Sequence, residues 1–548
     1  MKMLTLEYNL AELPSSQHRA GLAGLVLMTR WLADEPDKKG VCEITQISNI
    51  GAAFQLDKEG LQSLFDKVYA AFWKTIETDK KPTNKKTQFK AVEREVIDEE
   101  TGRVEKKTFY TKKVVTPLGA FLVDYDPTAS KNEGIWINLW RDALWATLRS
   151  RDRQQIPYQK RVETQEISDA GDIWKMLSKS PNKEEKLAST LYVGAEDSNP
   201  ENVQFKDRSR VKLLLHFWFF IAQIYVPKIY KFDKKKNTEE PKDFGFALAI
   251  PDVADLENFC EILPDVLQDR STEKFGYRPK ESIVDIAAES GLDLLSKINR
   301  KLSNKININL QDLILGVDVF HLEKKGNNVR LWATSRIDPT IDIDLYRNIK
   351  ERFTSPLFRR QKLLNLLNDR PPFDGFGALL SKTDAELTVG SKSWFFSQDA
   401  RTAFEIAGVQ IKSKGANEMD TETQEISPKT IAEIVYKLVF YYILAKLDSK
   451  YGLVWKKVKE TSEGRKKYNE MKGKIAREAF LAIRSRTDSD FIEYFVSTLC
   501  AFPQFLREDG YLTLTTALHN DTEKTRTLTM LALSANGYSP KEKKEESQ

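Results

Sequence analysis

The residue types that most often carry catalysis are few in this chain and are not grouped. The four histidines are His18, His216, His321 and His519, and none lies at metal-ligand spacing from another histidine or from a cysteine. The chain contains no GxxxxGK[ST] phosphate loop, no GxSxG nucleophile turn and no HExxH zinc motif. The sequence therefore predicts no catalytic residues, no bound metal and no cofactor.

A metal-dependent nuclease needs only acidic residues and a lysine, so this class stays open as an alternative. The best candidates are Asp252 with Glu323 and Lys325, or the pair Asp342 and Asp344. The first set is spread over about seventy positions, and two of its members lie next to a predicted hairpin turn. Acidic residues on strand edges and loops are usually solvated, so we expect that the chain is not an enzyme.

The chemistry that the sequence favours is contact with nucleic acid through clustered basic residues. The formal net charge is only +5, but Lys429–Arg486 holds fifteen Lys and Arg against six Asp and Glu, so this stretch carries +9 and the rest about −4. A helix over about 464–486 would place basic residues on the face opposite its apolar residues and present them to phosphates. The predicted contacts are Lys466, Lys474, Arg477 and Arg484.

Two N-terminal segments are further candidates for contact with nucleic acid. Residues 80–113 contain eleven Lys and Arg against six acidic residues, and EREVI and RVEKKTFY read as a hairpin around DEETG. The predicted contacts there are Lys85, Lys86, Lys106, Lys107, Lys112 and Lys113. In RSRDRQQIPYQKR, arginine can hold phosphate or guanine and glutamine can reach base edges. Those contacts are Arg149, Arg151, Arg153, Gln154 and Gln155.

The elements that must position these residues indicate an α+β protein with more than one domain. Residues 1–418 read as a mixed α/β N-terminal part, with room for two subdomains, that lacks a regular βαβ alternation. It opens on a strand and a helix over about 18–33, followed by a helix over about 58–76. Residues 419–537 read as an all-helical bundle, and residues 538–548 as a disordered tail.

The cysteine content indicates a reducing compartment, and we expect a cytoplasmic protein. Cys42, Cys260 and Cys500 form no CxxC pair, which argues against a disulfide framework or a zinc ribbon. The apolar stretches 20–32 and 213–226 are shorter than the ~18 residues that a membrane-spanning helix needs. We therefore expect buried elements and no membrane partner.

The opening strand with LPSSQHRAGLAGLVLMTRWL (Leu13–Leu32) resembles the start of the large subunits of type I CRISPR Cascade complexes. The resemblance is closest to the Myxan subtype, which is related to type I-B, and the plan of a mixed part followed by a helical part agrees. It implies a non-catalytic large subunit of an RNA-guided surveillance complex. Such a subunit reads the protospacer-adjacent motif on duplex DNA, contacts the 5′ end of the guide RNA and stabilises the R-loop.

The same resemblance implies partners. These are the CRISPR guide RNA, target double-stranded DNA, the backbone and guide-end-capping subunits, and an effector helicase-nuclease or transposition proteins. Some genes of the family also produce a separate small subunit by internal initiation. Met419 lies directly before the helical part, so translation from it would yield a 130-residue small subunit from residues 419–548.

Other functions share some of these features. A general nucleic-acid-binding scaffold would use the same basic segments without a CRISPR complex, and a nuclease would use the acidic candidates. A scaffold that binds only proteins would show weak binding of nucleic acid that is indifferent to salt, whereas phosphate binding falls steeply with ionic strength.

Overall fold

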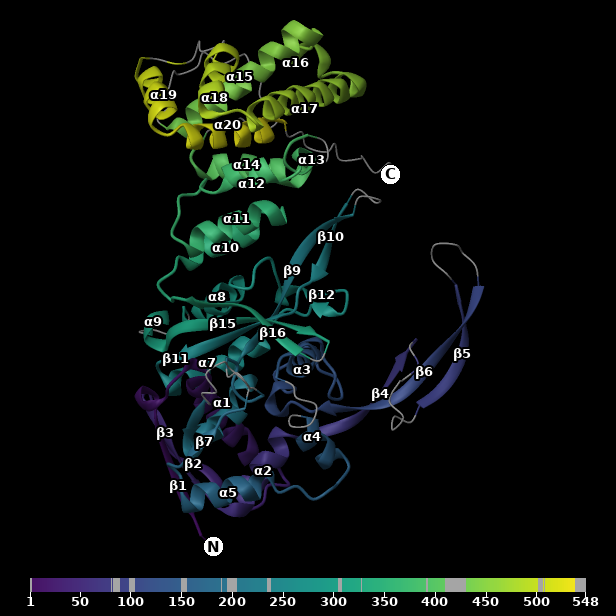
Figure 1. Ribbon diagram of the computed structural model, residues 1–548, viewed down its shortest axis with the longest axis vertical. Coiled ribbons are helices and arrows are strands. Elements are labelled where there is room, and N and C mark those ends of the chain that lie inside the picture. The colour runs from purple at the N-terminus through teal and green to yellow at the C-terminus, as the bar shows by residue number, and fades with distance from the viewer. Residues whose placement is uncertain are drawn as a thin grey trace. The chain divides into compact units, whose positions relative to one another are not determined.

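The computed structural model describes residues 2–79, 81, 89–97, 104–148, 155–188, 190–194, 205–233, 238–303, 308–326, 328–390, 393–409, 430–500, 506 and 508–537. The chain divides into two compact units, Met1–Ile341 and Asp342–Gln548. The sheets lie in the first unit, and the described part of the second unit is helical (Figure 1). The predicted α+β class is therefore confirmed.

The boundary between the two units, after Ile341, lies earlier in the chain than the predicted division between residues 418 and 419. The predicted division between residues 418 and 419 falls within 410–429, outside the described residues, as do the start of the helical part and the tail 538–548. The last strand ends at Ile337, and helices begin at Ile343. The helices of 343–406 therefore belong to the second unit, although the sequence analysis assigned them to the mixed part.

The first unit is built around helix α1 (Ser16–Ala33), which matches the predicted helix and is buried along most of its length. Gly21 and Gly24 let it approach the chain at 214–217, because a Cβ on either would overlap the carbonyl oxygen of Leu214 or Phe217. Three strands in the order β1-β3-β2 form an antiparallel sheet nearby. They are β1 (Leu4–Asn9), β3 (Gly51–Leu56) and β2 (Cys42–Ser48).

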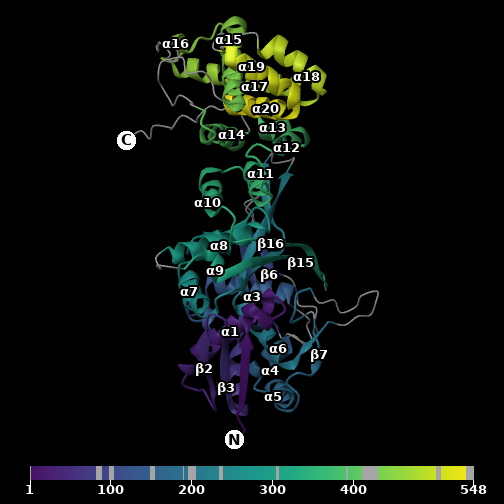
Figure 2. The same ribbon diagram turned by 90° about the vertical axis from the view of Figure 1, so that its left-hand side faces the viewer.

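The central sheet has the strand order β10-β9-β11-β15-β16, with the short β14 pairing β9 in parallel. Strand β11 lies in the middle and all eight of its residues are buried. Helix α1 packs against β11, and α8 (Glu289–Leu302) packs against β11 and β15, on opposite sides of the sheet in Figures 1 and 2. The strands are β9 (Gln223–Asp233), β10 (Thr238–Asp243), β11 (Phe246–Val253), β14 (Ile283–Val284), β15 (Ile314–Lys325) and β16 (Asn328–Ile337).

A third sheet projects from the first unit as an arm (Figure 1). Its order is β4-β6-β5, with β4 (Ala71–Thr78), β5 (Phe89–Ile97) and β6 (Val104–Pro117), and both pairings are antiparallel. The predicted hairpin is confirmed as β5 and β6. The helix predicted over 58–76 is wrong beyond Val68, because α2 (Lys58–Val68) ends there and β4 follows. Aromatic and β-branched residues dominate β4, which favours a strand.

The other elements of the first unit connect these parts. The apolar stretch 213–226, expected to be buried, forms short 3₁₀ turns and the start of β9. The remaining helices and strands are α3 (Ile135–Thr147), α4 (Gln155–Val162), α5 (Asp169–Lys179), β7 (Glu184–Lys186), β8 (Lys206–Arg208), α6 (Ser209–Lys212), α7 (Leu256–Gln268), β12 (Lys274–Phe275), β13 (Arg278–Pro279) and α9 (Leu310–Leu313).

The second unit packs around its last helix, α20 (Thr522–Gly537), which is buried along most of its length. Helices α12, α14, α15 and α17 all contact α20, as Figure 2 shows. The other helices of this unit are α10 (Ile343–Arg352), α11 (Pro356–Leu367), α12 (Phe376–Lys382), α13 (Ala385–Thr388), α14 (Trp394–Ile406), α15 (Ile431–Tyr451), α16 (Trp455–Val458), α17 (Ser462–Arg484), α18 (Asp488–Tyr494) and α19 (Glu508–Asn520). Within the described part of the chain, no helix has the length and apolar character needed to cross a membrane.

Candidate nucleic-acid interface

The arm separates its basic residues onto two faces, because neighbouring residues of a strand point to opposite sides of a sheet. The register pairs Lys107 with Arg94 and Lys113 with Thr75, whereas Lys106 pairs with Glu95 and Lys112 with Phe89 and Ile76. We call the face that carries Lys107 and Lys113 the basic face. It holds four cationic and two acidic positions. Its charged register positions are Lys90, Arg94, Lys107 and Lys113, with Glu77 and Glu105.

The opposite face of the arm is more evenly charged. Its charged register positions are Lys74, Lys106 and Lys112, with Glu93 and Glu95. The ammonium of Lys74 is already paired with Glu133 at 2.8 Å. The predicted contacts Lys85 and Lys86 lie outside the described residues, so their position stays a prediction.

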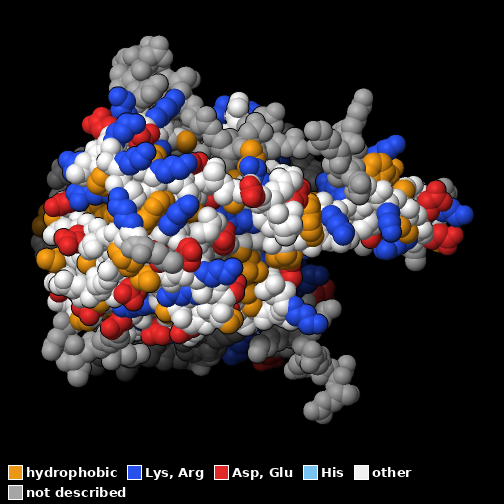
Figure 3. Space-filling model, turned by 90° about the horizontal axis from the view of Figure 1, so that it is seen from below, with side chains coloured by type: hydrophobic (Ala, Val, Ile, Leu, Met, Phe, Trp, Pro, Cys, Tyr) orange, Lys and Arg blue, Asp and Glu red, His pale blue; other side chains and the backbone are white. Residues whose placement is uncertain are grey.

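Aromatic side chains lie among these cations. Trp73 is 43% exposed on the basic face, and Phe89 is 37% exposed on the opposite face, with its ring centroid 5.5 Å from that of Tyr110. Figure 3 shows Lys and Arg side chains beside hydrophobic ones along the projecting arm. A basic strand surface with exposed aromatic rings offers phosphate contacts and stacking contacts together, which suits a nucleic acid.

The base of the arm is held rigidly against α3. The buried Arg141 guanidinium donates to the carbonyl oxygens of Pro117 at 2.7 Å, Leu118 at 3.2 Å and Asn132 at 2.9 Å. Burial lowers the pKa of Arg141 to about 10, so this side chain remains a cation near neutral pH. Because the arm leaves the body at a fixed point, its cations are presented in a defined direction.

Of the second predicted N-terminal segment, the part that lies in α4 packs beside the arm. Gln155 is the first residue of α4, and α4 packs against β4 and β6. Tyr158 anchors this helix, with its ring centroid 5.1 Å from Tyr69 and 5.4 Å from Trp145. The fold therefore brings α4 close to the arm, although 84 positions separate the start of α4 at residue 155 from the start of β4 at residue 71. Predicted contacts that lie outside the described residues are Arg149, Arg151, Arg153 and Gln154.

The four basic residues predicted to contact nucleic acid from α17 differ in their surroundings. Lys466 and Lys474 are exposed. Arg477 is instead 3.2 Å from Glu386, and Arg484 donates to the carbonyl oxygens of Ser381 at 2.8 Å and Thr383 at 2.6 Å. Arg477 and Arg484 therefore connect α17 to the chain around α12 and α13, and any role for them at a nucleic acid stays a prediction.

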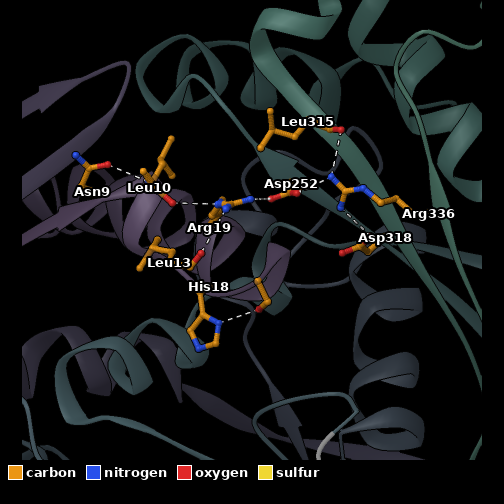
Figure 4. Close-up of polar contacts among 11 residues, drawn as sticks. Asn9, Leu10, Leu13, His18, Arg19, Asp252, Leu315, Asp318 and Arg336 are labelled. Atoms are coloured by element: carbon orange, nitrogen blue, oxygen red, sulfur yellow. Dashed lines mark hydrogen bonds and ion pairs between the residues drawn. The ribbon is translucent and has the colours of Figure 1, made fainter.

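The strongest nuclease candidate is held in a structural ion-pair network (Figure 4). Asp252 is 4% exposed and accepts from Arg19 at 2.5 Å and from Arg336 at 2.7 Å. Arg19 also donates to the carbonyl oxygen of Leu10 at 3.1 Å. Each carboxylate oxygen of Asp252 thus accepts from a guanidinium group, which gives this residue a structural role.

The other acidic candidates also have structural partners. Asp342 accepts from the backbone N–H of Leu345 at 2.7 Å as the N-cap of α10, and Asp344 pairs with Arg347 at 3.0 Å. Glu323 accepts from Trp332 Nε1 at 2.9 Å. Across the residues that the structure describes, no group of three or more His, Cys, Asp and Glu could hold a metal ion.

The motif 13–32 also serves packing. Gln17 exchanges two hydrogen bonds with the backbone of Val193, at 2.8 and 2.9 Å, and His18 Nε2 lies 2.8 Å from Asp207. Arg19 connects the same helix to Asp252 on β11. The polar residues of this motif therefore connect α1 to the sheet, to Val193 and to Asp207.

Sequence reasoning missed a group of aromatic and cationic side chains beside the central sheet. Phe275 and Tyr277, on the hairpin of β12 and β13, are 52% and 70% exposed. On β16, Trp332 is 44% exposed, with the guanidinium of Arg330 4.8 Å from its ring centroid. Only KFGYRP could have pointed to the hairpin, and strands of two residues are too short to show a period.

Two family models match consecutive parts of the chain. The type I-B CRISPR Cas8b N-terminal domain matches residues 41–307, and the type I-B CRISPR Cas8b C-terminal domain matches residues 314–536. Together they cover nearly the whole chain, although the motif 13–32 precedes the first match. No curated protein matches the chain.

Proposed function

Because the chain belongs to the Cas8b family of type I-B CRISPR large subunits, we propose that it acts without catalysis as the DNA-reading subunit of a Cascade complex. In this proposal it recognises the protospacer-adjacent motif on target duplex DNA, contacts the 5′ end of the guide RNA and stabilises the R-loop. Base pairing between guide and target then supplies the sequence specificity of the complex.

The observation that carries the proposal is the match of both Cas8b domains in order along one chain. The arm supports it physically, since exposed cations and aromatic rings lie on a strand surface that is anchored at its base. Lys466 and Lys474 add exposed cations on the second unit. The absence of catalysis is part of the proposal, and it is supported by the structural partners of Asp252, Glu323, Asp342 and Asp344.

The proposal extends to the partners. We propose that the chain assembles with the backbone and guide-end-capping subunits and recruits an effector helicase-nuclease or transposition proteins. A small subunit started at Met419 would contain α15–α20 but would lack α14, against which α20 packs. Met419 itself lies outside the described residues.

The arm gives the proposal a matched test. We predict that Lys107→Ala with Lys113→Ala, on the basic face, lowers the affinity for duplex DNA by about 5- to 20-fold, because each lost phosphate contact removes part of the counterion-release term. Lys106→Ala with Lys112→Ala removes the same charge from the other face and should lower the affinity less than about threefold. Fluorescence anisotropy of a labelled duplex, measured from about 50 to about 300 mM salt, gives the dissociation constant of each double variant and its dependence on salt.

The salt slope distinguishes a direct contact from a general effect of charge. For the Lys107 and Lys113 variant, the slope of log K against log salt should become shallower by about 1 to 2. Equal losses for both double variants would mean that the arm acts only through its net charge. No loss for either would contradict a role for the described part of the arm in binding duplex DNA.

A further inference from the structure

The hairpin of β12 and β13 ends in two exposed aromatic residues. Phe275 pairs with Arg278 across the hairpin, and Gly276 and Tyr277 form its two-residue turn. Gly276 has φ +61°, the conformation that glycine provides at the first central position of a tight hairpin turn. Phe275 is 52% exposed and Tyr277 is 70% exposed. Burying one such ring stabilises a protein by about 1.5–3 kcal/mol, so two exposed neighbours are an unusual arrangement.

The base of this hairpin is held firmly although its tip is exposed. Arg278 is 9% exposed and lies 2.7 Å from Asp142 on α3. The carbonyl oxygen of Ser271 accepts from Trp136 Nε1 at 2.9 Å. The backbone N–H of Ser271 donates to Glu281 at 2.7 Å. A platform whose base is already ordered loses little conformational freedom when a ligand binds to its tip.

Cations lie against both rings. The guanidinium of Arg278 is 4.5 Å from the ring centroid of Tyr277, and the ammonium of Lys228 is 5.7 Å from that of Phe275. The nearby carboxylate of Asp243 is paired with Lys228 and lies 3.7 Å from Arg278, so its charge is compensated. Lys274 and Lys280 flank the turn and are exposed. Lys280 is paired with Glu273 at 2.7 Å, and Arg278 is paired with Asp142 as well. The four cations around the rings thus exceed the carboxylates that pair with them by one, and this balance of one positive charge favours an anionic ligand.

Aromatic side chains also lie beside β16 of the same sheet. Phe244 follows Asp243, and its ring centroid is 5.1 Å from that of Trp332. Trp332 carries Arg330 over its ring and is 44% exposed. An exposed ring with a cation beside it offers a stacking contact to a base and a charge contact to its phosphate.

From these contacts we propose that the Phe275–Tyr277 turn is a stacking site for an unpaired nucleotide base, with the adjacent cations on the flanking phosphates. The inference rests on the proposed function, because it concerns a nucleic acid held by the same subunit. Every base presents a flat aromatic face, so such a site holds a strand without selecting its sequence. Asp243 and Asp142 pair with the cations that lie against the rings, so a groove on a protein partner is the alternative that the test must separate.

The test compares probes that differ only in their bases. The purified full-length chain is titrated with a fluorescein-labelled oligo(dT) 20-mer, an abasic 20-mer and a 20-base-pair duplex. We expect the wild-type chain to bind oligo(dT) at least about fivefold more tightly than the abasic strand. Phe275→Ala with Tyr277→Ala should remove that difference and leave the affinity for the duplex and the salt slope unchanged.

Two further variants serve as controls. Phe275→Tyr with Tyr277→Phe keeps both rings and should restore the preference for bases, since only the hydroxyl has moved. Tyr511→Ala removes a ring that is 44% exposed on α19 and should leave all three affinities unchanged. Unaltered duplex binding by the alanine variant shows that the first unit remains folded.

The outcomes separate the two proposals. If the wild-type chain binds oligo(dT) and the duplex but the alanine variant binds oligo(dT) equally well, the stacking site is wrong and the proposed function stands. If the wild-type chain binds none of the three probes, the proposed function itself fails. If the variant keeps its preference for bases but loses a Cascade subunit that co-purifies with the wild type, the turn is a protein-docking surface and the inference is overturned.

Discussion

At the scale of single residues, the polar groups that first suggest chemistry in this chain mostly hold its fold together. Asp252 lies at the end of β11, where the register against β15 shifts, and its carboxylate joins Arg19 of α1 to Arg336 of β16. These three residues are far apart in sequence and meet only through the folded sheet. The charge of Asp252 is therefore explained by the two guanidinium groups that it satisfies.

Substitution of Asp252 tests this reading. Asp252→Ala leaves the half-buried Arg19 without its carboxylate, and we predict a loss of about 2–3 kcal/mol in the free energy of unfolding of the first unit. Asp318→Ala, which removes only a contact of the more exposed Arg336, should cost less than about 1 kcal/mol. Urea unfolding followed by far-UV circular dichroism measures both. Magnesium-dependent cleavage of DNA that disappears in a stable Asp252→Ala protein would instead support the nuclease.

His216 gives the first unit a predictable response to pH. Its Nδ1 is 2.6 Å from the Tyr69 hydroxyl, and burial lowers the pKa of His216 from its ordinary 6.5 to about 4. Between these values the unfolded chain binds the proton and the folded chain does not, so stability falls as pH drops from about 6.5 to about 4. The loss should reach about 2–3 kcal/mol.

The measurement is a set of urea unfolding curves at pH 7, 6, 5 and 4. His216→Gln removes the titrating group, so its stability relative to wild type should rise by the same amount as the pH falls through this window. His519→Gln, an exposed substitution on α19, serves as the control and should keep the wild-type profile. A difference between wild type and His216→Gln that stays constant with pH would contradict the assignment.

At the scale of elements, the hairpin of β15 and β16 packs in the first unit, although the family model for the C-terminal domain includes it. The Cas8b C-terminal domain match begins at residue 314, yet β15 pairs with the whole length of β11 and belongs to the central sheet of the first unit. A division of the chain at the family boundary would expose one edge of a fully buried strand.

Truncation distinguishes the two boundaries. We predict that a fragment of residues 1–341 is soluble and unfolds cooperatively, because it contains every strand of the central sheet. A fragment of residues 1–313 lacks β15 and β16 and should aggregate, since the β11 edge is left unpaired. Size-exclusion chromatography and thermal unfolding of the two fragments decide the matter. A monomeric, cooperatively folded 1–313 fragment would show that the hairpin is dispensable.

The sequence predicted elements whose signals are local. The helix α1, the hairpins β5–β6 and β15–β16 and the long helix α17 all follow from periodicity and turn residues. The strand β4 was missed because its apolar residues Phe72 and Ile76 also fit the spacing of the preceding helix. Pairing of β9, β11 and β15 depends on contacts between distant segments, which one sequence does not reveal.

Some residues of the candidate interface could likewise be predicted from the sequence, and others could not. Lysines of the arm could be predicted because charge density is visible in the sequence. The exposure of Phe275 and Tyr277 could not, since it depends on how a short hairpin is anchored by Arg278 and Asp142. Nor does the helical period of α17 reveal that Arg477 and Arg484 have partners around α12 and α13.

At the scale of the whole molecule, the chain is a member of the Cas8b family with exposed basic and aromatic surfaces, and its buried Asp252 is engaged in ion pairs. The first unit presents the arm and the aromatic turn, and the second presents Lys466 and Lys474 on α17. Under the proposed function, these surfaces would hold a guide and its target within the Cascade complex.

The most direct measurement is to purify the tagged chain gently, expressed with its neighbouring genes, and to sequence the RNA that accompanies it. The account predicts short RNAs with ends derived from CRISPR repeats, together with several copies of a backbone subunit. RNA without a defined sequence, or no RNA at all, would contradict assembly into a guide-bearing complex and would favour a general nucleic-acid-binding scaffold.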